Sequence, residues 1–474
     1  MKHKTTTTDC NSQQMIFQDL GRKKVEADFN GGTITSDGGA VLLREINQQY
    51  NITQEFANCF TDYRNPKKIE HTVTELLTQR IMGICLGYED LNDHDELRHD
   101  PMIAAICNKT DPLGLERKDI RDKGKALAGK STLNRLELTG IDADKNTLYK
   151  KIVANDTAIR EFYVNQFIKK YPCAPKEIIL DVDATDDPLH GQQEGRFFHG
   201  YYDCYCYLPL YFFCGEDLLS AKLRKADIDA SKGTVEELQF IVGIIREHWP
   251  EVQIIIRGDS GFCREEIMLF CEENSLKYIF GLAGNKRLYS KIRKKMKKVR
   301  RKYTKTWTGQ KRYTSFFYKT LKTWTGKRKV IAKVEYLPKG ENPRFIVTNL
   351  YEEESKVLYE KIYCARGDME NRIKEQQLYL FADRTSTHTF RANQIRLWFA
   401  SVAYVLMSYL RYFGLAGTEL EKAQCQTIRL KLFKIGAQFK VSFRRIFISM
   451  AECYPFKNIF YKVYNNLRLQ PGST

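Results

Sequence analysis

The sequence predicts an α/β protein in which a mixed sheet with covering helices lies between helical N- and C-terminal regions. Three observations lead to this prediction. From Phe17 to about Lys170, apolar residues recur mostly at helical spacing. Short apolar runs rich in Ile, Tyr and Phe follow at 177–183 and 197–214, and strand patterns then alternate with helical ones. Strands in a run followed by such alternation favour a mixed sheet covered by helices.

Individual elements can be read within this frame. The segment TVTELLTQRIMGICLGY at 72–88 has apolar residues at helical spacing and a glycine near its end, which predicts a helix. After the first strands, the pattern predicts a strand at 218–223, a helix at 233–249, a strand at 252–259, a helix at about 264–275, a strand at 277–283, and helices at 397–411 and 427–439.

These elements divide the chain into six parts. We expect a disordered tail at 1–14, a helical N-terminal DNA-binding domain at 15–170, the first part of the catalytic core at 171–284, a β-rich basic insertion at 285–350, the second part of the catalytic core at 351–412, and a helical C-terminal region at 413–474.

Positive charge is concentrated in the insertion. The net charge of the chain is +18, and residues 285–344 alone carry 22 Lys or Arg against two acids, Glu335 and Glu341. A polyanionic partner is therefore implied, because this density exceeds what solubility requires. The insertion also repeats a short unit, KTWTGQKR at 305–312 and KTWTGKRK at 322–329. Recurring aromatics and turn glycines favour β-structure over a disordered tail.

Other compositional features exclude several classes of protein. The 13 cysteines are irregularly spaced without a C-x-x-C pair, which favours reduced cysteines over zinc ligands or disulfides. No apolar run reaches the roughly 20 residues that span a membrane, and the polar start does not read as a signal peptide.

Two aspartates stand where apolar strands end. Asp183 closes the run ILDVD, and Asp259 closes IIIRGD. A strand holds such a group rigidly at the rim of a sheet, which suits catalysis, although many such residues only cap a turn. Asp181 lies two residues before Asp183 and faces the same side, so it is an alternative for the first position.

A third acid belongs to a helical face. Tyr363, Arg366, Glu370, Lys374 and Gln377 are spaced so that a helix places them on one side. A solvated, salt-bridged surface would show the same spacing, and a helix that began only at Gly367 would break it. Three carboxylates from different elements could together hold two divalent ions, which is how phosphodiesters are cleaved in many enzymes.

The three blocks LDVDATDDPLHG, IIIRGDSGFC and Y-x-x-R-x-x-x-E resemble DDE transposases of bacterial insertion sequences, in the branch with a Tyr-Arg-Glu-Lys signature. The N-terminal run DFNGGTITSDGGAVLL is similar to the same group. The resemblance covers about 27–410. It implies a ribonuclease-H-like catalytic core interrupted by a β-rich insertion between the second Asp and the Glu.

The resemblance also implies roles for individual residues. Asp183, Asp259 and Glu370 match the catalytic, metal-binding triad, with two Mg²⁺ or Mn²⁺ ions per active site. Tyr363 and Arg366 match residues that contact the transposon end. The signature Lys falls on Gln377 here, a departure for which Lys374, one turn earlier, could compensate.

Further DNA contacts are expected from the insertion. In the family, a Trp stacks on a flipped base when a hairpin forms, and Trp307 and Trp324 are the candidates here, each of which could instead pack in a small core. Lys311 and Arg312 are the last two residues of the first repeat unit and are expected to contact DNA as well.

The expected function is that of a DNA transposase. Such an enzyme would bind terminal inverted repeats, free 3′ hydroxyls by hydrolysis, and join them to target DNA, with a hairpin intermediate implied by the signature. Its expected partners are double-stranded DNA and a second subunit in the synaptic complex, in the bacterial cytoplasm at the nucleoid. The alternatives are a non-catalytic, transposase-derived repressor and a nuclease without strand transfer.

Overall fold

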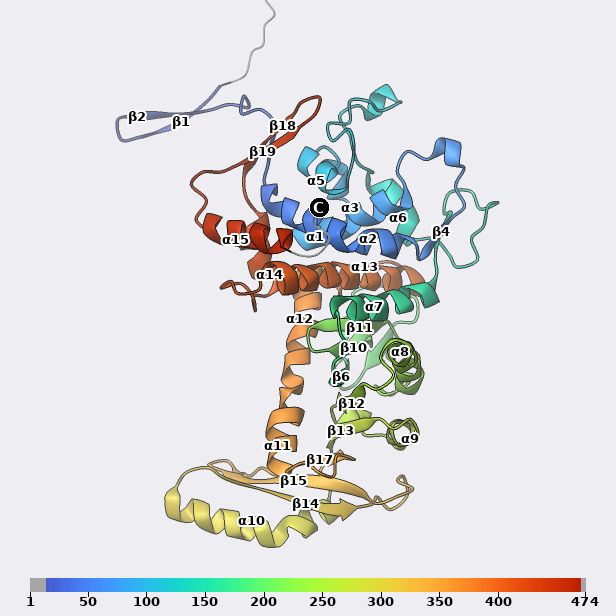
Figure 1. The fold of residues 1–474 in the computed structure, drawn as a ribbon, viewed down its shortest axis with the longest axis vertical. Coiled ribbons are helices and arrows are strands. Elements are labelled where there is room, and N and C mark those ends of the chain that lie inside the picture. The colour runs from blue at the N-terminus through green and yellow to red at the C-terminus, as the bar shows by residue number, and fades with distance from the viewer. Residues whose placement is uncertain (1–13, 470–474) are drawn as a thin grey trace, which may run out of the picture.

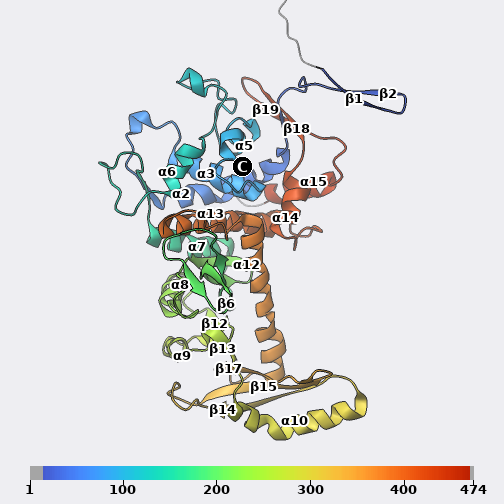
Figure 2. The same ribbon diagram turned by 180° about the vertical axis from the view of Figure 1, so that it is seen from behind.

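A computed structural model of the chain describes residues 14–469. The predicted tail at 1–14 lies outside the described residues, except for Gln14. Along its long axis the molecule stacks a helical unit, a central sheet with its helices, and a terminal layer that carries α10 (Lys286–Thr306) (Figures 1 and 2). A helical column, from α11 (Ser355–Val357) to α12 (Gly367–Leu380), runs alongside the sheet and connects the terminal layer to the helical unit.

A nine-stranded mixed sheet forms the centre, as predicted. Its order is β11-β10-β6-β12-β13-β17-β15-β14, and β16 pairs with β15. β6 pairs in parallel with β12, and β12 with β13, while the remaining pairs are antiparallel. The strands are β6 (Glu177–Ala184), β10 (Leu210–Cys214), β11 (Asp217–Lys222), β12 (Gln253–Gly258), β13 (Lys277–Leu282), β14 (Gln310–Tyr318), β15 (Arg328–Leu337), β16 (Gly340–Glu341) and β17 (Arg344–Thr348). Because β6 and β12 are parallel neighbours, their carboxyl ends meet at one edge.

Helices cover both faces of this sheet. One face packs under α7 (Asp156–Lys170), α8 (Thr234–His248), α9 (Glu265–Glu273) and α10, in one hydrophobic cluster. The other face meets α13 (Phe390–Tyr409) beside β10 and β11. Beside β12, β13, β15 and β17, it meets the helical segment Leu358–Tyr363.

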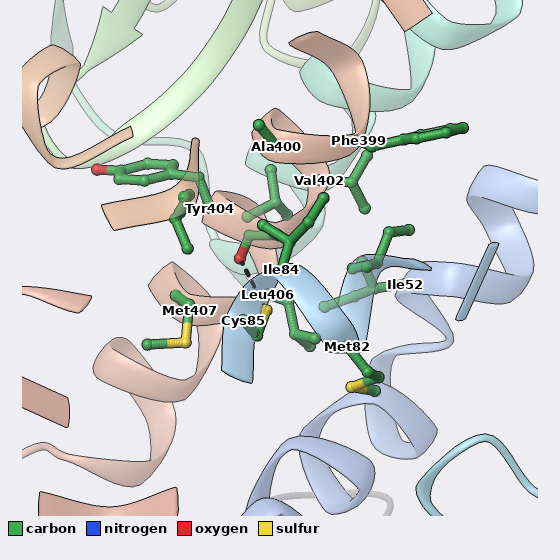
Figure 3. Close-up of a cluster of buried hydrophobic side chains, with 14 of the residues drawn as sticks. Ile52, Met82, Ile84, Cys85, Phe399, Ala400, Val402, Tyr404, Leu406 and Met407 are labelled. Atoms are coloured by element: carbon green, nitrogen blue, oxygen red, sulfur yellow. Dashed lines mark hydrogen bonds between the residues drawn. The ribbon is translucent and has the colours of Figure 1, made fainter. Parts of the chain in front are cut away.

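The helical unit is built from both ends of the chain. α3 (Val73–Leu86), which begins with a capping box at Thr72 and ends at Gly87, lies against α13 (Figure 3). The Cys85 thiol donates a hydrogen bond to the Ala403 carbonyl (3.7 Å). Around this pair lie α1 (Val41–Tyr50), α2 (Ile52–Ala57), α4 (His94–Leu97), α5 (Pro101–Ile106), α6 (Lys130–Glu137), α14 (Cys425–Ile428) and α15 (Lys457–Arg468). N- and C-terminal residues share one hydrophobic core, so the predicted N- and C-terminal parts form a single unit.

Small sheets complete the fold. They are β1 (Met15–Leu20) with β2 (Lys23–Ala27); β4 (Phe60–Asp62) with β5 (Ile152–Ala154); β7 (Asp187–Pro188), β9 (Cys204–Tyr207) and β8 (Phe197–His199); and β3 (Ile34–Thr35), β18 (Ala437–Val441) and β19 (Ile446–Met450). The short helical turns are η1 (Gly38–Ala40), η2 (Pro66–Lys68), η3 (Ile120–Asp122), η4 (Ser260–Phe262), η5 (Leu358–Tyr363), η6 (Cys364–Arg366), η7 (Leu410–Gly414) and η8 (Arg429–Phe433).

One prediction of local structure was incomplete and another was wrong. The insertion contains the strands β14 to β17, but it opens with the 21-residue helix α10, whose Leu288, Ile292 and Met296 pack on the sheet at helical spacing. The C-terminal region is not helical throughout. The helix expected to reach Phe439 ends with η8, and Phe439 lies in β18, which pairs with β3 and β19. None of the described helices is both long enough and apolar enough to cross a membrane.

Candidate active site

Asp183 lies near the carboxyl end of β6, where the backbone runs beside β10. Its Oδ1 accepts the Ala184 N–H (2.9 Å), and its Oδ2 accepts a hydrogen bond from the Arg366 guanidinium (3.0 Å). Burial raises the pKa of Asp183 to about 7; the charges of Asp259 and Glu370 add to this rise, and Arg366 opposes it. The three carboxylates are therefore close enough to influence each other.

Asp259 directly follows β12, the parallel neighbour of β6. It caps the turn η4, and its Oδ1 accepts the Gly261 N–H (2.7 Å). This cap fixes the carboxylate at the strand end, beside Asp183, and leaves Oδ2 available. Asp259 therefore lies at the end of a strand, as predicted, and it also caps the turn that follows.

Glu370 reaches the same edge from α12. The Arg366 guanidinium donates to Glu370 Oε1 (2.6 Å) as well as to Asp183 Oδ2 (3.0 Å), so it links helix and strand. The helical column continues through η5 and η6 into α12, which begins at Gly367. Because the turns before Gly367 are also helical, Tyr363, Arg366 and Glu370 stay on one side of the column.

Asp181 has a different environment from Asp183. Arg257 lies opposite it in the register of β6 and β12, and its guanidinium donates to both Asp181 oxygens (2.5 and 2.7 Å). Both side chains are buried, and Arg257 also donates to the Ile362 carbonyl (2.5 Å). A buried carboxylate held by a bidentate Arg is committed to structure, so the geometry favours Asp183 over Asp181 as the reactive group.

The carboxylates can be tested for their fit to metal ions. Among residues 14–469, no group of three His, Cys, Asp or Glu side chains stands ready to hold an ion. Here the guanidinium of Arg366 provides the positive charge between Asp183 and Glu370. Hard oxygen donors on three rigid elements are nevertheless the ligands that Mg²⁺ or Mn²⁺ prefers. Burial raises the pKa of Asp183 despite the neighbouring Arg366, so a further cation beside this carboxylate would favour its charged form. The donor set fits a divalent cation.

The helical face predicted to contact DNA is only partly available. Tyr363 is half-buried beside a pocket of about 480 Å³ whose lining includes Lys333 and Arg344. Lys374 is exposed on α12. Gln377, at the signature Lys position, instead turns to the loop after Asp183: its amide donates to Asp187 Oδ1 (2.9 Å) and to the Asp186 carbonyl (3.0 Å).

The two repeat tryptophans have opposite environments. Trp307, at the end of α10, is 78% exposed and has a positive φ of 52°. Trp324 is only 5% exposed; it packs edge-on against Tyr318, with the Arg328 guanidinium over its ring. The Trp324 ring is part of the hydrophobic core, which is the alternative to DNA contact that the sequence left open for both tryptophans. Lys311 and Arg312 are exposed on β14, and Lys311 pairs with Glu360 (2.6 Å).

Sequence reasoning missed Arg257 and Asp187 as parts of this region. Arg257 interrupts an otherwise apolar strand, which was a usable signal, because a buried guanidinium requires an acid. Asp187 had no comparable signal. It is fully buried, and burial raises its pKa to about 8, yet only the strand pairing of β7 places it there.

Comparisons with known proteins identify the family of the chain. A search of curated proteins found no significant match. Among the solved structures that match is a cryo-EM structure of the piggyBac transposase synaptic complex with hairpin DNA; it is 12% identical, covers 84% of this chain and 80% of that chain, and has a TM-score of 0.42. The family model described as transposase DDE domain, group 1, matches residues 17–471, nearly the whole chain. The chain therefore belongs to the DDE transposase family.

Proposed function

We propose that this protein is the transposase of a bacterial insertion sequence, which cleaves the ends of its element and joins them to target DNA. The observation that carries the proposal is the single guanidinium of Arg366, bound to both Asp183 and Glu370 at the edge where Asp259 also ends its strand. Three acids from three elements meet there, as the ribonuclease-H-like core of the family requires.

The chemistry follows from this arrangement. Asp183, Asp259 and Glu370 would hold two divalent ions, which activate the attacking water or 3′ hydroxyl and stabilise the leaving oxygen. β6 and β12 fix two of the acids rigidly, and Arg257 holds the two strands in register through Asp181. Arg366, once released from the carboxylates, is placed to contact a phosphate of the transposon end, with Tyr363 beside it.

Contact with DNA would extend beyond the active site. α10 carries twelve Lys or Arg and no acid, and its apolar stripe faces the sheet, so its opposite side offers charge to phosphates. Trp307 at its end is free to stack on a base. Two subunits would bring the two ends together in a synaptic complex, acting on DNA at the nucleoid in the bacterial cytoplasm.

The test is a cleavage assay on labelled DNA that carries the element's own end and flank, with Mg²⁺. Asp259→Ala and Glu370→Gln should abolish cutting and retain DNA binding, while Glu236→Gln, an exposed acid on α8, should cut like the wild type. Hairpin or joined products would establish transposition. Binding without cutting by every protein would support the repressor alternative, and cutting without joined products would support a nuclease.

A further inference from the structure

A groove opens in the helical unit, far from the carboxylates. It has a volume of about 670 Å³ and lies between the helices α1 and α5 on one side and the β18–β19 hairpin on the other. The hairpin forms one wall, from Val441 to Ile448, and Arg44, Asn108 and Lys109 belong to the opposite wall. In Figure 1, this hairpin and α10 lie at opposite ends of the long axis.

The charges in this groove have one sign. Four of the described residues that line it are cations, and none is Asp or Glu; the cations are Arg44, Lys109, Arg444 and Arg445. Lys109 is neutralised by Glu75 (2.8 Å), and Arg44 binds only the neutral amide oxygen of Asn108 (3.0 Å). Within residues 14–469, the side chains of Arg444 and Arg445 make no ion pair. Three cations without an acidic partner therefore face one space.

An aromatic ring accompanies these charges. Phe443 stands at the tip of the hairpin, directly before Arg444, and is 100% exposed. Phe447, further along the same hairpin, is 48% exposed. In the isolated protein, a fully exposed ring contributes no burial of apolar surface to the stability of the fold. Contact with sugars or bases in a groove of DNA would bury it, as apolar wedges of other DNA-binding proteins do.

We propose that this groove, which we call the hairpin groove, binds duplex DNA through its phosphates, by means of Arg44, Arg444 and Arg445, with Phe443 against the sugars or bases. The proposal rests on the transposase function and adds a second DNA surface to that of α10. Because the two surfaces lie at opposite ends of the molecule, they would engage different stretches of DNA. The β18–β19 hairpin would thereby have a role in holding the substrate.

A second copy of the chain is the main rival occupant. The β1–β2 hairpin is exposed along its whole length and could reach a neighbouring molecule. The uniform charge of the hairpin groove favours DNA, since the β1–β2 hairpin carries three basic residues, Arg22, Lys23 and Lys24, against two acidic ones, Asp19 and Glu26. It offers no excess of negative charge to three unpaired cations.

The test measures the affinity of the full-length protein for a labelled duplex of random sequence, several helical turns long, over a series of KCl concentrations. Three variants are compared with the wild type. The first is a double variant that combines Arg444→Ala and Arg445→Ala, and the second is Phe443→Ala alone. The third is a triple variant on the outer side of α10, with Lys294→Ala, Lys298→Ala and Arg301→Ala. A double variant that removes the same charge from an exposed loop of the helical unit, Lys145→Ala with Lys150→Ala, is the control. Sedimentation gives the oligomeric state of each protein.

If the hairpin groove binds phosphates, the Arg444 and Arg445 variant should lose on the order of tenfold in affinity, and its salt slope should fall by about two. Phe443→Ala should weaken binding without changing the slope, and the control should match the wild type. An unchanged slope and affinity for the Arg444 and Arg445 variant, while the α10 variant loses both, would overturn the groove and leave the transposase proposal intact. A change of oligomeric state without a change in DNA affinity would assign the groove to a second subunit instead. Failure of the wild type to bind DNA would overturn both proposals.

Discussion

At the scale of single residues, the position of Asp183 should reduce the stability of the protein. Its folded-state pKa, about 7, lies above its ordinary value of 3.8, so the folded state binds more protons than the unfolded state between these values. The free energy of unfolding should therefore fall as pH rises through this window, and the full penalty should be present above about pH 7.

Asp183→Asn removes the ionisable group and should relieve this penalty. In metal-free buffer above about pH 7 we expect the variant to be more stable by up to about 4 kcal/mol, since the two pKa values differ by about three units and each unit corresponds to about 1.4 kcal/mol. The gain should disappear as pH falls toward about 4, and cleavage should be lost at every pH. Urea unfolding at several pH values measures this, with the exposed Asp227→Asn as control. An equal stability of variant and wild type at all pH values would contradict the argument.

The two tryptophans of the repeat should respond oppositely to truncation. Trp324→Ala removes a core ring and should cost about 3–5 kcal/mol of stability. Trp307→Ala removes an exposed ring, so stability should be nearly unchanged, and DNA affinity should fall by about 1–3 kcal/mol if the ring stacks on a base. Thermal unfolding and DNA titration of both variants separate the roles. A loss of stability in Trp307→Ala would show that this ring packs too.

The sequence singled out Asp183, Asp259 and Glu370 as candidates by their setting, but it could not choose between neighbouring residues with equivalent patterns. Asp181 and Asp183 share one face of β6, and only the register with β12 places Arg257 opposite Asp181. Trp307 and Trp324 stand in nearly identical KTWTG units. One ends a helix with a positive φ, and the other packs on Tyr318, which is a difference of tertiary contact.

At the scale of elements, α12 is tied to the loop after Asp183 by Gln377, which spans Asp187 Oδ1 and the Asp186 carbonyl. We therefore expect Gln377 to position the loop after Asp183, whereas the signature Lys at this position would contact DNA. Gln377→Ala should therefore lower the rate of cleavage and cost about 1 kcal/mol of stability through the lost hydrogen bonds, with DNA affinity unchanged.

Lys374→Ala, on the exposed side of the same helix, should lower DNA affinity and leave stability unchanged. Titration, single-turnover cleavage and urea unfolding of the two variants test this, and a weaker affinity in Gln377→Ala would return the residue to a DNA-contact role.

Secondary structure was predictable where one pattern dominated a segment. The strands β6, β12 and β13 and the helices α3, α8 and α9 lie close to their predicted ranges. α10 was missed because Thr, Tyr and Trp recur across the insertion as a whole and favoured strands. The spacing of Leu288, Ile292 and Met296 within its first half already indicated a helix.

At the scale of the whole molecule, the division into domains could not be derived from the order of elements along the chain. The predicted N-terminal domain and C-terminal region form one unit around α3 and α13, because residues far apart in sequence share a core. The N-terminal motif ITSDGG shows how they join. Buried Asp37 binds Lys434 (2.7 Å) and accepts the Tyr88 hydroxyl hydrogen (2.7 Å), and Gly39 lies against η8.

Gly39 should therefore be essential to the joining of the two chain ends. A Cβ at this position would lie 1.7 Å from the Leu432 carbonyl oxygen, so Gly39→Ala forces η8 away from η1. We expect the free energy of unfolding to fall by about 3 kcal/mol or more, the upper end of the range typical of overpacking. New protease cleavage should appear between η8 and β19. Gly243→Ala is the matched control: no atom lies within 4 Å of its added Cβ in α8, and it should gain up to about 1 kcal/mol from helix propensity. Urea unfolding and limited proteolysis compare the two. If Gly39→Ala unfolds at the same urea concentration as the wild type, the contact with η8 does not hold the two ends of the chain together, and the sequence-based division into separate terminal domains becomes the better description.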